Sequence, residues 1–177
     1  MSKAVVLDTE TTGINPQDEL IELGLILFEY SPKDGEILDI IETYQGYNEP
    51  KRKYIPDNIV QLTDLTWELV QGEFIDKNKV MTLITRADML IAHNARFDRY
   101  YLSKVLPEVK RMKWKCTMLN IPWRKLGVGS LSLQNILNVH GIIQHNKHHA
   151  LSDARSILEL LQIRARNGKR YMSYLTK

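Results

Sequence analysis

The chain has 177 residues, of which 44% are hydrophobic and 25% charged, and its formal net charge of +3 is too small to indicate a nucleic-acid-binding protein by itself. This length suits one hydrophobic core, so we expect a single domain over residues 1–177. No apolar run approaches the roughly 20 residues of a bilayer span, the N-terminus lacks a signal-peptide pattern, and the single cysteine, Cys116, excludes an internal disulfide framework, so we expect a cytoplasmic protein that does not contact a membrane.

The first half of the chain predicts a three-stranded meander followed by helices. A short apolar strand covers residues 3–7. Residues 20–30 (LIELGLILFEY) form a longer strand, and residues 36–44 form a third strand after the turn sequence SPKDG. The spacing of the apolar residues then becomes helical over residues 56–71 and 75–87.

The second half predicts strands that alternate with helices. The strands cover residues 87–93 and 114–118, and the helices cover residues 94–106, 130–140 and 150–165. Pro107 ends the first of these helices, and Ser130 or Ser132 lies near the start of the second. Hairpin strands followed by this alternation predict an α/β fold, with a mixed sheet flanked by helices. Ligands of such sheets gather at strand ends.

Two carboxylates follow the first strand in a D-x-E pattern. Asp8 ends that strand, and Glu10 projects from the same side of an extended backbone. Two carboxylates on one side repel each other unless a cation lies between them, and Mg²⁺ prefers such oxygen ligands. The alternative is a solvated strand end, with Thr11, Thr12 and Gly13 forming a turn.

Two further carboxylates lie at the edges of apolar helix faces. In HNARFD, Asn94 and Asp98 share one face of a helix. The alternative is that Asn94 only caps the helix and Asp98 pairs with Arg99. Asp153 lies one turn ahead of Ile157, at the edge of another apolar stripe. A carboxylate at such an edge is costly without a partner, so the three segments predict a site assembled from distant parts of the chain.

Three motifs in this order, DTETTG at residues 8–13, HNARFD at residues 93–98 and HHALSDA at residues 148–154, closely resemble the motifs of the DEDDh exonuclease family. That family includes the proofreading subunits of bacterial replicative polymerases. The resemblance implies an RNase H-like fold, in which a mixed five-stranded sheet of three antiparallel strands and then parallel strands is flanked by helices. One departure is Asp64, where similar proteins often carry glycine, and it affects the contacts of that loop with substrate.

The resemblance implies a metal-dependent 3′-to-5′ exonuclease that releases 5′ mononucleotides from single-stranded ends. Two Mg²⁺ or Mn²⁺ ions would be held by four carboxylates, with Asp8 bridging both ions: Asp8, Glu10, Asp98 and Asp153. Two such ions activate a water and stabilise the leaving 3′ oxygen. A histidine would act as general base, because its pKa lies near the working pH.

The resemblance also implies a site for the terminal nucleotide. The turn of Thr11, Thr12 and Gly13 would line it, Ile14 and Leu62 would wedge against the base, and Asn94 would contribute to substrate binding. Basic residues are bunched in four clusters that could guide the phosphate backbone, over residues 51–53, 110–115, 124–125 and 164–170. The sequence does not show which cluster does so.

The sequence predicts the substrate and the partners less precisely than it predicts the site residues. DNA is favoured over RNA, and the alternatives are an RNA-trimming exonuclease of the same family or a catalytically silent accessory module. A silent relative would be expected to have lost one of the five site residues, and none is missing. Candidate partners are single-stranded DNA or RNA ends and a polymerase or another replication or repair protein.

Two adjacent histidines compete for the role of general base. His149 lies four residues before Asp153, about 40° away around a helix, whereas His148 lies about 140° away. Helical geometry therefore favours His149, but the family pattern H-x-A-x-x-D matches His148. We predict that His148 is the base, which requires it to lie on a loop outside the regular helix.

Overall fold

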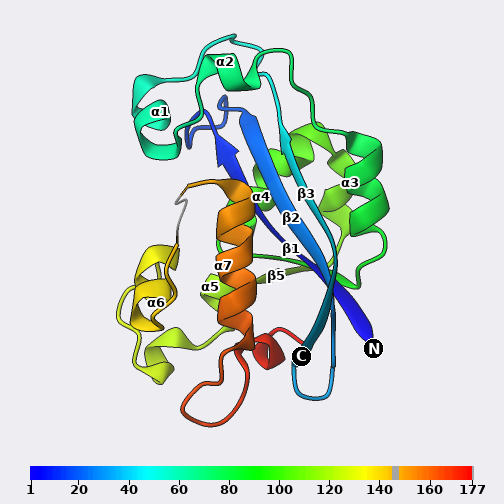
Figure 1. Ribbon diagram of the computed structural model, residues 1–177, viewed down its shortest axis with the longest axis vertical. Coiled ribbons are helices and arrows are strands. Elements are labelled where there is room, and N and C mark those ends of the chain that lie inside the picture. Colours follow the sequence, from blue (N-terminus) through cyan, green and yellow to red (C-terminus); the bar gives the residue numbers. More distant parts are fainter. Residues whose placement is uncertain (145–147, 177) are drawn as a thin grey trace.

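The computed structural model describes residues 1–144 and 148–176. Its centre is a five-stranded sheet in the order β3-β2-β1-β4-β5 (Figure 1). The strands are β1 (Ser2–Thr11), β2 (Leu20–Tyr30), β3 (Ile37–Tyr47), β4 (Met89–Ala92) and β5 (Trp114–Cys116). The first three strands pair antiparallel, and β4 and β5 join them in parallel. This confirms the predicted mixed sheet with its antiparallel and parallel halves.

Strand β1 is longer than predicted. The expectation that it ends at Asp8 is wrong, because the ladder with β2 pairs Asp8 with Gly24 and Glu10 with Glu22 before the register shifts next to Thr11. The apolar run alone could not reveal this, since the polar end of β1 is held extended by its partner strand. Asp8 and Glu10 therefore lie within the strand and share one face of it.

Seven α-helices and three short 3₁₀ helices are described. They are α1 (Asp57–Thr63), α2 (Trp67–Val70), α3 (Lys77–Ile84), α4 (Ala95–Val105), η1 (Pro107–Arg111), α5 (Thr117–Asn120), η2 (Trp123–Leu126), α6 (Leu133–Val139), α7 (Ala150–Gln162) and η3 (Tyr171–Tyr174). Helix α6 begins after Ser132, whose side chain accepts a hydrogen bond from the backbone N–H of Asn135, so Ser132 is its cap. No helix of the described chain is long and apolar enough to cross a membrane.

One predicted helix is divided in two, and the helices predicted over residues 75–87 and 150–165 each end three residues early, at Ile84 and Gln162. The segment 56–71 is broken at Asp64, whose backbone φ of 57° is left-handed, the conformation in which glycine is most at ease. This conformation explains why glycine suits that position. Helix α7 stops at Gln162 rather than 165, because Ile163 is extended and Arg164 pairs with Arg170 in an isolated bridge.

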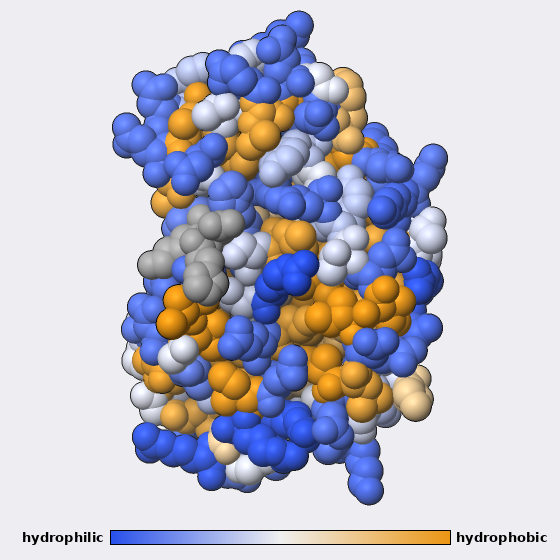
Figure 2. Space-filling model, in the orientation of Figure 1, coloured by the Kyte–Doolittle hydropathy of each residue, from blue (hydrophilic) through white to orange (hydrophobic). Residues whose placement is uncertain are grey.

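The helices cover both faces of the sheet, as Figure 1 shows. Alternate residues of β1 enter two separate cores: Ala4 and Val6 pack with Ile157 of α7, whereas Val5 and Leu7 pack with a cluster that includes Leu102 of α4. The face that carries α7 shows apolar side chains interrupted by hydrophilic ones (Figure 2), as on the surface of most folded proteins. The site lies where the carboxyl end of β1 emerges between these two layers.

Candidate active site

Three carboxylate-bearing segments meet at the carboxyl end of β1. Because β4 runs parallel to β1, helix α4 begins at this end of the sheet and brings Asp98 there, while the first turn of α7 brings Asp153. The pKa of Asp8 is raised well above its ordinary value, first by burial and then by the charges of Asp98, Asp153 and Glu10. The four predicted metal ligands therefore form one electrostatically coupled cluster.

A glycine on β2 allows α7 to lie directly against the sheet. A Cβ atom on Gly24 would lie 2.1 Å from the backbone nitrogen of Leu151 and 2.3 Å from the carbonyl carbon of Ala150. No side chain fits at such a distance. Gly24 also pairs with Asp8 across the β1–β2 ladder. This close approach therefore sets the first turn of α7 beside the acidic end of β1.

A buried carboxylate of β2 holds the start of α7. Glu22 is fully buried, and its Oε2 accepts the backbone N–H of Ala150 at 3.0 Å. Its Oε1 accepts a hydrogen bond from the amide of Gln45 on β3 at 2.6 Å. Sequence reasoning did not assign Glu22 a role. The available signal was a charged residue inside the apolar run LIELGLILFEY.

Asp98 is buried and is held by a hydroxyl group rather than by a cation. The hydroxyl of Thr9 donates a hydrogen bond to Asp98 Oδ1 at 2.9 Å, from the face of β1 opposite to Asp8. Arg99, the alternative partner considered from the sequence, donates instead to the backbone carbonyl of Lys110. Burial raises the pKa of Asp98 to about 7, although the Thr9 hydrogen bond lowers it in part.

Asp153 and Glu10 complete the cluster. The side-chain amide of Gln144 donates to Asp153 Oδ1 at 2.8 Å, a contact that the sequence gave no means to predict. Burial raises the pKa of Asp153 to about 7, while burial and the neighbouring carboxylates Asp153, Glu22 and Asp98 raise the pKa of Glu10 to about 8. Carboxylates that resist ionisation together in this way are stabilised by a bound cation. The oxygen-only set of four carboxylates fits Mg²⁺ or Mn²⁺.

The two adjacent histidines lie near different carboxylates. His148 lies outside α7 with a left-handed backbone φ of 59°, which confirms that it is not part of the regular helix. One ligand atom each of Glu10, His148 and Asp153 lie within 4.8 Å of one another. His149 occupies the N-cap position, and its Nδ1 lies 3.9 Å from Glu22 Oε2. His148 therefore lies beside the carboxylate cluster, whereas His149 lies beside Glu22, the buried residue that accepts the first N–H of α7.

The predicted turn after β1 is built mainly from its own side chains. Thr11 and Thr12 are buried; the Thr11 hydroxyl donates to the Gly13 carbonyl, and the Thr12 hydroxyl accepts the backbone N–H of Glu19 at 2.9 Å. A Cβ atom on Gly13 would lie 2.4 Å from the carboxylate of Asp18. These residues shape the turn, so any contact that they make with a nucleotide would come mainly from the backbone.

The other predicted substrate contacts are open to solvent. Ile14 is 83% exposed and Leu62 is 50% exposed, so both side chains are accessible to a ligand. Asn94 occupies the N-cap position of α4, yet its side chain makes no capping hydrogen bond. The alternative assignment of Asn94 as a simple helix cap therefore lacks the bond that would define it.

Helix α4 also fixes the turn that carries Ile14, through residues that the sequence did not single out. The Tyr101 hydroxyl donates to the Asn15 carbonyl at 2.8 Å, and Lys104 Nζ donates to the Asp18 carbonyl at 2.8 Å.

His93, the first residue of HNARFD, is buried between the Thr117 hydroxyl at 2.9 Å and the Leu131 carbonyl at 2.8 Å. Burial lowers its pKa, so it serves the packing behind the site as a neutral imidazole.

Comparisons with known proteins identify the family of the chain. The sequence profile of the family RNase_T, described as an exonuclease, matches residues 5–161. The PolC-type DNA polymerase III of Clostridium perfringens is 31% identical over 175 residues, which cover 95% of this chain but only 12% of that protein. The DNA polymerase III subunit epsilon of Treponema pallidum is 28% identical over 162 residues, covering 86% of this chain and 72% of the relative.

The fold is shared with a solved structure as well. The structure of E. coli exonuclease I in complex with a dT13 oligonucleotide superposes with a TM-score of 0.72 at 16% identity. The match covers 92% of this chain and 40% of that one. At this identity the likeness concerns the fold alone.

Proposed function

Because the chain belongs to the exonuclease family, we propose that it hydrolyses phosphodiester bonds from the 3′ end of single-stranded nucleic acid, DNA in preference to RNA, and releases 5′ mononucleotides. The observation that carries this proposal is the cluster of Asp8, Glu10, Asp98 and Asp153, in which burial raises the pKa of every carboxyl group. A purely structural cluster of this kind would destabilise the fold without a compensating gain.

The four carboxylates would hold two Mg²⁺ or Mn²⁺ ions. When bound, such ions increase the acidity of a water and neutralise the charge that develops on the phosphate and the leaving oxygen. Thr9 and Gln144 orient the oxygens of Asp98 and Asp153 through hydrogen bonds of 2.9 and 2.8 Å. Fixing the ligands in this way reduces the reorganisation required when cations bind.

His148 is the proposed general base. Its position near Glu10 and Asp153 allows an imidazole nitrogen to take the proton of the attacking water, while the water oxygen bonds to phosphorus and the bond to the 3′ oxygen breaks. Ile14 and Leu62 are proposed to contact the terminal base, with Asn94 and the turn of residues 11–13 beside the sugar. Apolar contacts of this type tolerate any base, as the trimming of strands of any sequence requires.

The polymerase relatives support a replication or repair polymerase as partner, because both are DNA polymerase III components. A silent accessory module is the second candidate. It is disfavoured because all five proposed catalytic side chains are present: Asp8, Glu10, Asp98, His148 and Asp153.

The deciding experiment compares end-labelled single-stranded DNA and RNA of matched sequence, incubated with Mg²⁺, Mn²⁺ or a chelator. We expect stepwise shortening from the 3′ end, faster on DNA, that stops with chelator and in Asp153→Asn. Faster trimming of RNA than of DNA would show that RNA is the preferred substrate. Absence of chelator-sensitive trimming on both would refute the enzyme assignment.

A further inference from the structure

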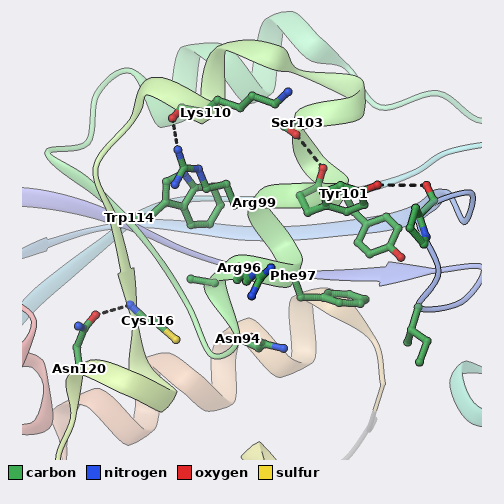
Figure 3. Close-up of a pocket in the computed structure, with 14 residues that line it drawn as sticks. Asn94, Arg96, Phe97, Arg99, Tyr101, Ser103, Lys110, Trp114, Cys116 and Asn120 are labelled. Atoms are coloured by element: carbon green, nitrogen blue, oxygen red, sulfur yellow. Dashed lines mark hydrogen bonds between the residues drawn. The ribbon is translucent and has the colours of Figure 1, made fainter.

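A groove of about 720 Å³ runs along α4, beginning beside the proposed nucleotide site (Figure 3). Its lining includes Ile14 and Asn94 as well as Trp114, Cys116 and Asn120. The groove therefore connects the proposed site for the terminal nucleotide with the edge strand β5. Neither the carboxylate cluster nor its histidine uses this space.

The groove is positively charged. Arg96, Arg99 and Lys110 contribute to its wall, and none of its 14 lining residues, all within the described chain, is acidic. A second groove of about 800 Å³ also contains lysines but has Asp18, Glu19 and Glu49 in its wall. Of these two grooves, the first has only basic residues among its charged lining residues and also includes Ile14 and Asn94 of the proposed site, so its charge favours a polyanion.

Aromatic side chains line the same groove and are fixed in place. The rings of Phe97 and Tyr101 pack with their centroids 4.7 Å apart, and the Trp114 indole donates to the Val109 carbonyl at 2.8 Å. The Arg99 guanidinium is anchored by its bond to the Lys110 carbonyl, drawn as a dashed line in Figure 3. Cations and aromatic rings together are the usual composition of a surface that binds single-stranded nucleic acid without sequence preference.

We propose that this groove binds the segment of the single strand on the 5′ side of the nucleotide being removed. The proposal rests on the proposed function and extends it. The carboxylate cluster repels a phosphate backbone at longer range, so a neighbouring basic surface is needed to retain a strand. Helix α4 provides both parts: Asp98 faces the cluster, while Arg96 and Arg99 line the groove. Of the four basic clusters in the sequence, this assigns the guiding role to the one that contains Lys110.

The salt dependence of binding tests the proposal. The double variant Arg96→Ala/Lys110→Ala removes two exposed cations from the groove, and Arg124→Ala/Lys125→Ala removes two exposed cations that do not line it. Binding of a labelled oligonucleotide of about 12 nucleotides is measured by fluorescence anisotropy in chelator, over roughly 50 to 200 mM salt. We expect the slope of log affinity against log salt to become shallower by about 1.4 in the groove variant, about 0.7 per lost phosphate contact, and to stay unchanged in the control.

Equal changes of slope in the two variants, or no change in the groove variant, would overturn the proposal. A protein partner would then be the alternative occupant. These outcomes are distinct from failure of the proposed function, which would appear as absence of trimming by the unmodified protein. An enzyme that trims normally but whose groove variant binds like the control would retain the function and lose the groove.

The single cysteine offers a second readout in the unmodified protein. Cys116 lines the groove and is partly exposed, so its rate of alkylation by iodoacetamide reports occupancy. We expect the 12-nucleotide strand to slow alkylation and a 5′ mononucleotide, which fills only the terminal site, to leave the rate unchanged. Equal rates with and without the longer strand, at concentrations where anisotropy shows saturation, would contradict binding in the groove.

Discussion

The carboxylate of Glu22 accepts the backbone N–H of Ala150 at 3.0 Å, so a residue of strand β2 caps the helix that carries Asp153. The N-cap residue of α7, His149, makes no side-chain capping bond of its own. A helix leaves its first N–H groups without intrahelical partners, and a negative charge there is favoured by the helix dipole. Glu22 thus supplies from the sheet what the helix lacks in its own sequence.

Replacing Glu22 should separate its hydrogen bonds from its charge. We expect Glu22→Ala to lower the free energy of unfolding by about 2 kcal/mol, because the buried Ala150 N–H and the Gln45 amide lose their acceptor. Glu22→Gln retains an acceptor for Ala150 and should lose less. Urea denaturation followed by circular dichroism measures both variants, and equal stability of Glu22→Ala and the unmodified protein would contradict the capping role.

The two histidines should differ sharply in their effect on turnover. His148→Ala should reduce kcat by at least about 100-fold, the usual contribution of a general base, with the fold intact. His149→Ala should keep most of the activity, since its side chain lies next to Glu22 rather than next to Glu10 and Asp153. Single-turnover trimming of labelled DNA gives both rates. The reverse ranking would transfer the role of base to His149.

The raised carboxylate pKa values predict how the metal-free protein responds to pH. Folding raises the pKa of Glu10 to about 8 and those of Asp98 and Asp153 to about 7, from ordinary values near 4. The folded state therefore binds more protons than the unfolded state between roughly pH 4 and 8, and its stability falls as the pH rises through that window.

Thermal unfolding in chelator tests this response. We expect the midpoint temperature of unfolding to decrease as the pH rises from about 5.5 to 8. Mg²⁺ or Mn²⁺ should raise this temperature again, most strongly at the higher pH, because cations stabilise the ionised carboxylates. Asp153→Asn, which removes one charge from the cluster, is expected to flatten the dependence. A midpoint in chelator that does not change across this range would contradict the raised pKa values of these carboxyl groups.

Gly24→Ala should disturb both stability and catalysis. The added Cβ would lie 2.1 Å from the Leu151 backbone nitrogen, so α7 must move away from the sheet and carry Asp153 with it. Overpacking of this kind costs up to about 3 kcal/mol. Gly129→Ala is the matched control, because a Cβ there meets no atom within 4 Å. Similar urea midpoints and trimming rates for the two variants would refute the need for this close approach.

Much of the fold and the site could be predicted because its signals are local. The apolar run of β2 predicted that strand to the residue, and the three motifs identified the carboxylates that meet in space. Contacts made across the fold could not be predicted. The extension of β1, the Glu22 cap of α7 and the Gln144 bond to Asp153 all depend on which element lies beside which.

The groove illustrates the same limit for charge. The sequence identified the cluster around Lys110 as one of several, but Arg96 and Arg99 became its neighbours only when α4 and η1 packed together. Arg99 is the alternative partner that the sequence offers for Asp98, but its guanidinium donates to the Lys110 carbonyl instead. Spacing along a helix shows which residues share a face; it does not show what that face meets.

Both faces of β1 contribute to the site, and this limits where the chain can accept insertions and deletions. Asp8 and Glu10 belong to the face that packs on α7, and Thr9 reaches Asp98 from the other face. A slip of one residue in the pairing of β1 would exchange the two faces and bury the carboxylates where Leu7 now packs. Insertions and deletions should therefore be accepted in the exposed turn at residues 32–34 and rejected anywhere within β1. The register of β1 therefore determines whether Asp8 and Glu10 reach the carboxylate cluster.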